Sequence, residues 1–175
     1  MKLKLKEIDF EKLVYSLNNG IFGEECKMIN YSYQGSEFEF QTPKVIIEKI
    51  IKENSKEYLL LKILGTEACR TFYSKISELE DTHNSVISKH NEWFNNSLPI
   101  GNVKSVFKGQ TFLVKVPFKY SSPNIKIYKD SRLFNYYHLK EGMEIICLLG
   151  CNNLWINFDN NVSYHLILKE IMITK

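Results

Sequence analysis

Short stretches in which apolar and polar residues alternate make up most of the chain, and this pattern predicts β-strands. The alternation is clear over 27–33 ("KMINYSY") and 37–41 ("EFEFQ"), and the Gly35-Ser36 pair between them is a turn signal, so we expect a hairpin there. A further strand is expected over 57–64 ("EYLLLKIL"). After residue 101 the same pattern resumes in "VKSVF", "TFLVKV", "NIKIY", "MEIICLL", "LWINF" and "SYHLILKEIMI".

One segment has a helical period instead. Its apolar and weakly polar positions recur at steps of three and four residues, at Phe72, Ile76, Leu79, His83, Val86, Ile87, His90 and Trp93 or Phe94. This stripe predicts an amphipathic helix over about 67–95, with Thr66 as its N-cap. Strands, one long inserted helix and more strands predict an α+β, mostly β fold. A small OB-like barrel and a sandwich closed by the helix fit this order about equally.

The size and composition indicate one globular domain over residues 1–175. The chain is 44% hydrophobic and 25% charged, which is typical of a folded domain and not of a disordered segment. It has no apolar run of the length that a membrane span needs, so we expect no membrane association. The four cysteines are too few for a disulfide scaffold, and we expect reduced thiols and an intracellular location.

Sequence motifs of enzymes are missing. The phosphate-binding, dinucleotide-binding, nucleophile-elbow and zinc-protease patterns do not occur, so we expect no enzyme activity and no cofactor. His83 and His90 would share a helix face, and Cys147 and Cys151 are four residues apart, but neither pair has the ligand spacing of a zinc site. We interpret these four residues as structural and expect no metal.

Positive charge is concentrated in one part of the chain. Residues 101–140 carry eight cations against one acid, whereas the net charge of the whole chain is +3, so the rest of the chain is net negative. Eight aromatic rings occur among these cations: Phe107, Phe112, Phe118, Tyr120, Tyr128, Phe134, Tyr136 and Tyr137. Such a distribution of charge favours a polyanionic partner.

Single-stranded nucleic acid requires cations along its phosphates and flat faces for its unstacked bases, and this segment offers both. The candidate nucleic-acid-binding residues are Lys115, Lys119, Tyr120, Lys126, Tyr128, Lys129, Arg132, Tyr136 and Tyr137. Two other interpretations remain open. The segment could be half core and half solvated strand face, with lysines protecting a sheet edge, or it could contact another protein.

A family resemblance bears on this choice. The block "MINYSYQGSEFEFQTPK", followed later by "FLVKVP", "LKEGMEIICLLGCNNLWINF" and "HLILKEI", resembles small proteins of large nucleocytoplasmic DNA viruses that are similar to podophage-type single-stranded-DNA-binding proteins. The matched positions include Gly142, Leu154, Trp155 and Lys169. The resemblance implies an OB barrel with a helix between its strands and a viral replication or recombination factor that coats single strands. DNA is then the expected partner, and the host cytoplasm, the viral factory or the virion the expected location.

Two features depart from that family. Gln41-Thr42-Pro43 is followed by "KVIIEKIIKEN" where the family has a glycine-containing turn, and the sequence ends in "KEIMITK" where podophage-type proteins have an acidic tail. Recruitment of replication partners through a tail is therefore not implied. The alternative function is a virion-associated structural or interaction protein built on the same barrel, and viral replication or virion proteins and further copies of the chain are additional candidate partners.

Overall fold

The computed structural model describes residues 4–18 and 26–175. Its α-helix is α1 (Glu67–Ile87), and its 3-10 turns are η1 (Leu5–Glu7), η2 (Phe10–Lys12), η3 (Asn91–Trp93) and η4 (Tyr136–His138). Its strands are β1 (Leu13–Asn18), β2 (Cys26–Tyr33), β3 (Glu39–Gln41), β4 (Val45–Glu53), β5 (Lys56–Ile63), β6 (Phe107–Lys108), β7 (Thr111–Val116), β8 (Phe118–Lys119), β9 (Ser122–Pro123), β10 (Lys126–Lys129), β11 (Arg132–Leu133), β12 (Glu144–Gly150), β13 (Asn153–Asn157), β14 (Val162–Tyr164) and β15 (Leu166–Ile173).

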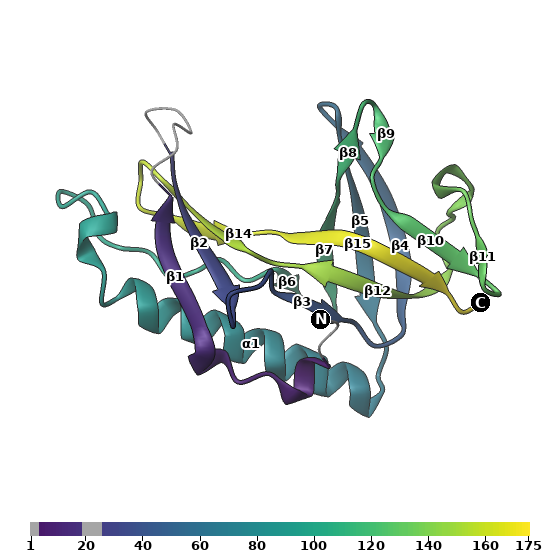
Figure 1. Ribbon diagram of the computed structural model, residues 1–175, viewed down its shortest axis with the longest axis horizontal. Coiled ribbons are helices and arrows are strands. Elements are labelled where there is room, and N and C mark those ends of the chain that lie inside the picture. The colour runs from purple at the N-terminus through teal and green to yellow at the C-terminus, as the bar shows by residue number, and fades with distance from the viewer. Residues whose placement is uncertain (1–3, 19–25) are drawn as a thin grey trace.

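Five strands close into a barrel, on the right of Figure 1. Going round it, β4 pairs with β5, β5 with β7, β7 with β15, β15 with β12, and β12 returns to β4. All of these pairs are antiparallel except β7 with β15, which is parallel. A five-stranded barrel of this kind is OB-like. The predicted barrel is confirmed, and the sandwich is not the observed arrangement.

Alternation along the strands decides which side chains fill the barrel. On β5, Leu59 and Leu61 are fully buried inside the barrel, whereas Tyr58 lies on the opposite, outer face. On β7, Val114 is buried and Lys115 lies on the outer face. Burial of each large aliphatic side chain contributes about 1.5 to 3 kcal/mol. The register is therefore strongly specified, because a slip of one residue would exchange the inner and outer sets.

A second sheet lies beside the barrel, on the left of Figure 1, in the order β1-β2-β13-β14. The segment 27–33 is a strand as predicted, but β2 pairs with β1 and β13, whereas β3 pairs with β12 of the barrel. The predicted hairpin between 27–33 and 37–41 is therefore wrong. Phe38 and Phe40 are both fully buried, and the chain leaves β2 after a single bridge in order to bury them.

The helix begins where the sequence predicts and ends earlier. Thr66 caps it, because its side-chain oxygen accepts a hydrogen bond of 3.2 Å from the backbone N–H of Cys69. The helix ends at Ile87 and not near residue 95. The Ser88 hydroxyl donates to a backbone carbonyl of the last turn, and the apolar stripe continues in η3, where Trp93 is buried.

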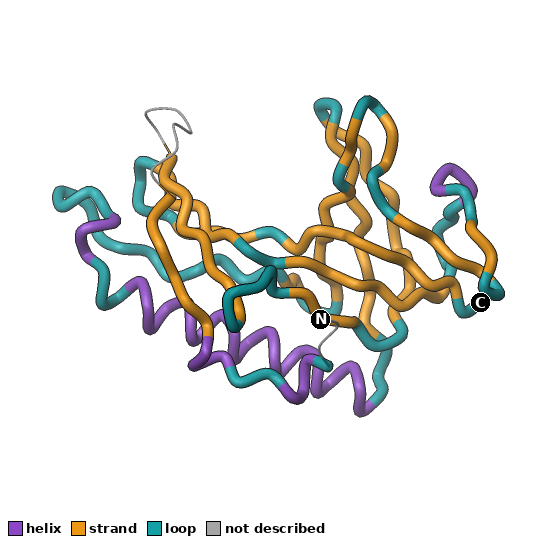
Figure 2. The backbone as a smooth tube through the Cα atoms, viewed as in Figure 1, coloured by secondary structure: helices purple, strands orange, loops and turns teal. Residues whose placement is uncertain are grey.

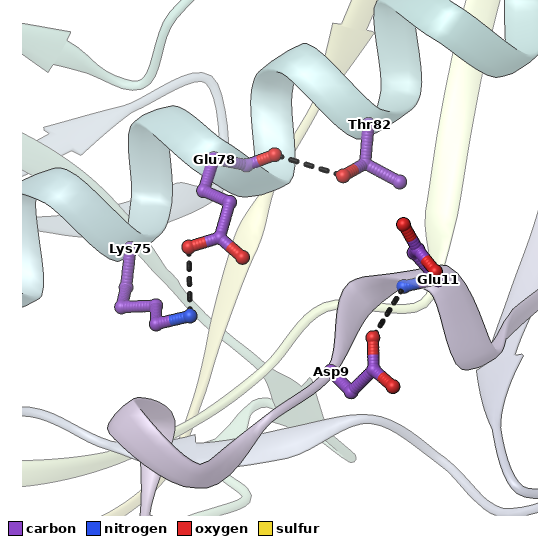
Figure 3. A network of polar contacts seen from close by, with 5 residues as sticks. All are labelled: Asp9, Glu11, Lys75, Glu78 and Thr82. Atoms are coloured by element: carbon purple, nitrogen blue, oxygen red, sulfur yellow. Dashed lines mark hydrogen bonds and ion pairs between the residues drawn. The ribbon is translucent and has the colours of Figure 1, made fainter.

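The solvent side of α1 is stabilised by local polar contacts, shown in Figure 3. Lys75 donates to Glu78 over 2.7 Å, and the Thr82 hydroxyl donates to the backbone carbonyl of Glu78 over 2.9 Å. Nearby, the Asp9 carboxylate accepts a hydrogen bond from the backbone N–H of Glu11 and so caps η2. Exposed pairs of this type contribute only a few tenths of a kcal/mol each, so the buried face supplies most of the binding of the helix to the sheets.

That buried face lies under both sheets, as Figures 1 and 2 show. Toward the N-terminal end of α1, Phe72 contacts Phe112 of the barrel strand β7 and two rings on strands beside the barrel, with centroid distances of 5.5 Å to Phe112, 6.2 Å to Phe40 and 6.0 Å to Phe107. Such aromatic pairs contribute about 0.5 to 1.5 kcal/mol each beyond the buried area. The helix and the barrel therefore share one core.

Farther along the helix, His83 is fully buried beneath the second sheet. Its Nδ1 lies 2.7 Å from the Tyr15 hydroxyl, and the rings of Tyr31 and Tyr164 pack against it at centroid distances of 4.7 and 5.5 Å. Burial lowers the pKa of His83 to about 3. His83 is thus a neutral core residue that joins the helix to the second sheet.

We expect His83 to make the protein less stable in acid. Its pKa is lower in the folded chain than the ordinary 6.5, so below about pH 6.5 the unfolded chain binds a proton that the folded chain does not. As the pH is lowered from about 6.5 to about 3, the free energy of unfolding should decrease, and His83 should contribute at most about 1.4 kcal/mol of this decrease per pH unit. Urea unfolding of wild type and His83→Gln at pH 7 and pH 4.5 measures it. An equal pH dependence in both proteins would contradict the assignment.

The described residues contain no helix that is long and apolar enough to cross a membrane. All four cysteines are free thiols, with Cys69, Cys147 and Cys151 buried and Cys26 exposed. The Sγ of Cys151 lies within hydrogen-bonding distance of the Tyr31 hydroxyl, and burial raises the pKa of Cys151 to about 12. The buried thiols act as small apolar side chains.

Candidate functional site

The basic aromatic segment connects the barrel strand β7 to the barrel strand β12. It forms the end of β7, a β8–β9 hairpin, β10, β11 and η4. Within it, β7 and β10 join the large sheet, whereas β8 and β9 pair only with each other. The predicted site residues are therefore distributed over several parts of the barrel surface.

Lys115 lies on the outer face of the barrel between two neighbouring strands. It is opposite Tyr58 of β5 on one side and opposite Ile167 of β15 on the other. One step along the same face, Leu60 and Leu113 are paired. Because paired residues share a face, the outer surface of β5 and β7 presents an ammonium group, a tyrosine ring and two leucines together. We call this surface the β5–β7 face.

A hollow of about 330 Å³ extends from the β5–β7 face toward the second sheet. It is lined by Tyr58, Lys104, Ser105, Val106, Lys108, Leu113, Lys115, Ser163, Tyr164, His165 and Leu166. Three of these described lining residues are lysines, and none of them has a carboxylate side chain. The hollow is therefore cationic, with an aromatic and an aliphatic wall.

His165 reports the positive potential in this region. Burial of the ring, and then the nearby ammonium groups of Lys115 and Lys56, hold the pKa of His165 below its usual 6.5. The imidazole is thus neutral at pH 7 and can donate or accept a hydrogen bond there. A phosphate in the hollow would be attracted by the lysines that disfavour a proton on His165.

The β8–β9 hairpin carries an exposed aromatic ring at its tip. The Tyr120 side chain is 91% exposed, and Tyr120 and Ser121 both have positive φ, at +52° and +62°. Two positive φ values are typical of a type I′ turn, which favours asparagine and glycine, so a tyrosine there is under backbone strain of about 1 to 3 kcal/mol. Lys119 Nζ lies 5.5 Å from the centroid of the Tyr120 ring. The same pair of positive φ values occurs at Asn54 and Ser55 and at Asp130 and Ser131, so this turn conformation recurs in the chain.

This hairpin and the β4–β5 hairpin rise from neighbouring strand ends. Glu57 near the start of β5 is paired with Val116 at the end of β7, and β8 begins two residues after Val116. Figure 1 shows both hairpins projecting from the same end of the barrel. Of the predicted residues, Lys119 and Tyr120 thus lie at the end of the strand that carries Lys115.

Lys126 and Tyr128 lie farther along β15, toward its C-terminal end. They are opposite Glu170 and Met172 of β15, respectively, and Lys126 lines a separate hollow with Glu39 and Lys169. The surroundings of Lys126 therefore contain carboxylates, unlike those of Lys115. β12 occupies one edge of β15, so β7 and β10 pair with successive parts of the other edge, and Lys115 and Lys126 lie along the same edge in surroundings of different charge. Lys129 and Arg132 are paired at the β10–β11 hairpin, farther along the same strand.

Tyr136 and Tyr137 lie at the end of the barrel. Tyr136 is buried, its hydroxyl donates to Glu57 over 2.6 Å, and its ring contacts Phe118 edge-on at 6.5 Å. Burial and the bond to Glu57 raise the pKa of Tyr136. A ring in this position does not offer a free face to a base. Tyr137 is 60% exposed, with Lys52 Nζ 5.9 Å from its ring centroid.

The residues that sequence reasoning missed come from outside the basic segment. Tyr58 and His165 line the cationic hollow, and Lys56 lies close enough to His165 to lower its pKa. The alternation in "EYLLLKIL" indicates that Tyr58 lies on the face opposite Leu59, but only the pairing of β5 with β7 places it beside Lys115. Lys104 and Lys108 were counted among the cations of the segment without being assigned to the site.

Within the described residues, no group of three or more His, Cys, Asp or Glu side chains is placed to hold a metal ion. His83 is in the core, and His90 lies beyond the helix and stacks on Trp93 at a centroid distance of 4.1 Å. The two histidines therefore do not share a helix face. The proposal that the protein binds no metal stays a prediction, to be checked by elemental analysis of the purified protein.

Comparison with solved structures finds a related architecture. Over 79% of this chain and 86% of the other, the structure is similar to the crystal structure of gp2.5, a single-stranded DNA binding protein encoded by bacteriophage T7. The TM-score is 0.56 and the sequence identity is 13%. The two proteins share a fold. No protein-family model matches the sequence, and no curated protein matches it either.

Proposed function

We propose that this chain is a sequence-tolerant single-stranded-DNA-binding protein that acts in viral replication or recombination, and that it is not an enzyme. The observation that carries the proposal is the cationic hollow beside the β5–β7 face. Lys104, Lys108 and Lys115 line it together with Tyr58, and the described lining includes no carboxylate-bearing residue. Strands two and three of an OB barrel, here β5 and β7, form the surface on which OB domains bind oligonucleotides.

The two parts of the site have different tasks in this proposal. The ammonium groups neutralise phosphates, which supplies affinity for any sequence and makes binding dependent on salt. The rings of Tyr58 and Tyr120 offer flat faces to unstacked bases, which are accessible in single strands and covered in a duplex. The exposed Tyr120 is consistent with this second task.

The viral and DNA-specific parts of the proposal are supported by the shared fold. The protein of similar architecture is encoded by a bacteriophage and is described as binding single-stranded DNA. The likeness is one of fold, so the assignment to DNA depends on the hollow and on the experiment below. RNA binding is the alternative that the experiment separates.

The test is a binding titration with fluorescent oligo-dT, the same length of oligo-U, and a duplex, each at several salt concentrations. We expect the tightest binding to oligo-dT, with a slope of log K against log salt of about -2 to -3.5 if three to five cations contact phosphates. Equal affinity for duplex at moderate salt would contradict the proposal. Tighter binding to oligo-U would assign the site to RNA.

Tyr120→Ala is expected to weaken oligo-dT binding by about 1 kcal/mol, the lower end of the range for one stacked base, because the ring must be ordered at a solvated tip. The salt slope should not change, since no cation is removed. The matched control is Tyr128→Ala, the same substitution on the β10–β15 side of the barrel, which should bind like wild type. Equal losses in both variants would contradict a stacking role for the hairpin.

A further inference from the structure

Trp155 lies on the outer face of the second sheet, outside the barrel. Its neighbours along β13, Leu154 and Ile156, are buried at 0% and 2% exposure, whereas Trp155 is partly exposed on the opposite face. It is paired with Met28 of β2 and with Ser163 of β14. Trp155 is the middle residue of β13, and its side chain lies on the accessible face of the second sheet.

The face that carries Trp155 is continuous with the cationic hollow. β14 runs into β15 through His165, and the alternation of buried and accessible residues is unbroken, so Ser163, His165 and Ile167 share one side. Trp155 is opposite Ser163 at one end of this row, and Lys115 is opposite Ile167 at the other. The row rises about 13 Å, which is the length of about four stacked nucleotides.

The chemistry changes along this row. Near Lys115 the surface is cationic, whereas around Trp155 the same face carries the uncharged side chains of Asn30, Asn153 and Ser163. Amide and hydroxyl groups can donate and accept hydrogen bonds with base edges, and an indole ring is a broad stacking surface. The region near Lys115 is thus suited to phosphates, and the region around Trp155 is suited to bases.

We propose that single-stranded DNA leaves the cationic hollow along β14, crosses the second sheet and stacks a base on Trp155. This proposal rests on the proposed function and extends the site beyond the barrel. It makes the second sheet, and not the barrel alone, part of the binding surface. The occupied length then exceeds what the β5–β7 face alone could cover.

The test uses the intrinsic fluorescence of the protein. The chain has two tryptophans, and the other one, Trp93, is only 5% exposed and stacked on His90. Emission of wild type and of Trp155→Phe is recorded while oligo-dT of about 4, 8, 12 and 16 nucleotides is added, lengths that span the known OB-fold sites. Binding of the same oligonucleotides is measured in parallel by anisotropy of a label on the DNA.

We expect the longer oligonucleotides to quench wild-type emission and the shortest to leave it unchanged, and we expect Trp155→Phe to show no quenching although it still binds. Trp155→Ala should bind the longer oligonucleotides about tenfold more weakly, with the shortest and the salt slope unaffected. Binding at every length without any change in Trp155 emission would overturn this inference and leave the proposed function intact. Absence of binding by anisotropy would overturn both.

Discussion

Replacing Lys104, Lys108 and Lys115 together by glutamine is expected to weaken oligo-dT binding about 50-fold at about 0.15 M salt. Each lost phosphate contact removes about 0.7 from the slope of log K against log salt, so three lost contacts flatten it by about 2. If both proteins bind equally at about 1 M salt, a slope difference of about 2 corresponds to a loss of about 50-fold at about 0.15 M salt. The three lysines line the same hollow, so they are expected to contact one strand together. Titration at four salt concentrations measures both quantities.

The matched control replaces Lys126, Lys129 and Arg132 by glutamine. It removes the same net charge from the β10 strand and the β10–β11 hairpin, where Lys126 is opposite Glu170. Long-range attraction changes equally in both variants, so any difference between them reports local contacts. We expect the control to keep most of the slope. If it loses as much slope as the first variant, the strand is not confined to the β5–β7 face.

The second large effect concerns stability. Phe72→Ala is expected to lower the free energy of unfolding by about 3 to 5 kcal/mol, because a large ring is removed from a packed site and leaves a cavity. Phe72 is 3% exposed and contacts Phe40, Phe107 and Phe112 of the barrel region. Urea unfolding followed by circular dichroism measures the loss. Its control is Tyr73→Ala, the next residue, which is 46% exposed and should cost about 1 kcal/mol.

The same unfolding curves test whether the chain is one domain. The helix packs against the barrel through Phe72 and against the second sheet through His83, so the three parts are expected to unfold together. Phe72→Ala should then shift one transition without splitting it. Two separate transitions, with only one of them displaced, would show that the barrel and the second sheet are independent units.

The fold was largely predictable because the strands and the helix have strong and different periods. Phe72, Ile76, Leu79, His83 and Ile87 of the predicted stripe are buried, and the alternating segments after residue 101 are strands except for "VKSVF", which becomes a strand only at Phe107. The pairing of strands was not predictable in the same way. Alternation indicates which face a residue occupies but not which strand lies beside it. The sequence therefore did not predict that β2 and β3 lie in different sheets.

The candidate site was predictable only in part for a related reason. The sequence grouped cations by their position in the chain, whereas a binding surface groups them across strands. Lys115 is next to Tyr58, from a distant part of the chain, while Lys126, from the same segment, faces Glu170. Tyr136 was expected to stack on bases, but the barrel end needs a large side chain, and its hydroxyl is bonded to Glu57. Tyr120 could be predicted because a hairpin turn is formed by residues that are adjacent in the sequence, so its exposure does not depend on which distant strands pair.

The central claim is that single-stranded DNA lies across the β5–β7 face, and ultraviolet crosslinking tests it most directly. Wild-type protein bound to oligo-dT containing iododeoxyuridine is irradiated, digested and mapped by mass spectrometry. We predict adducts on Tyr58 and Tyr120, which line the hollow and the hairpin beside it, and none on Tyr73 of the helix. Adducts confined to Tyr128 or Tyr73, with Tyr58 and Tyr120 unmodified in the bound complex, would contradict the account.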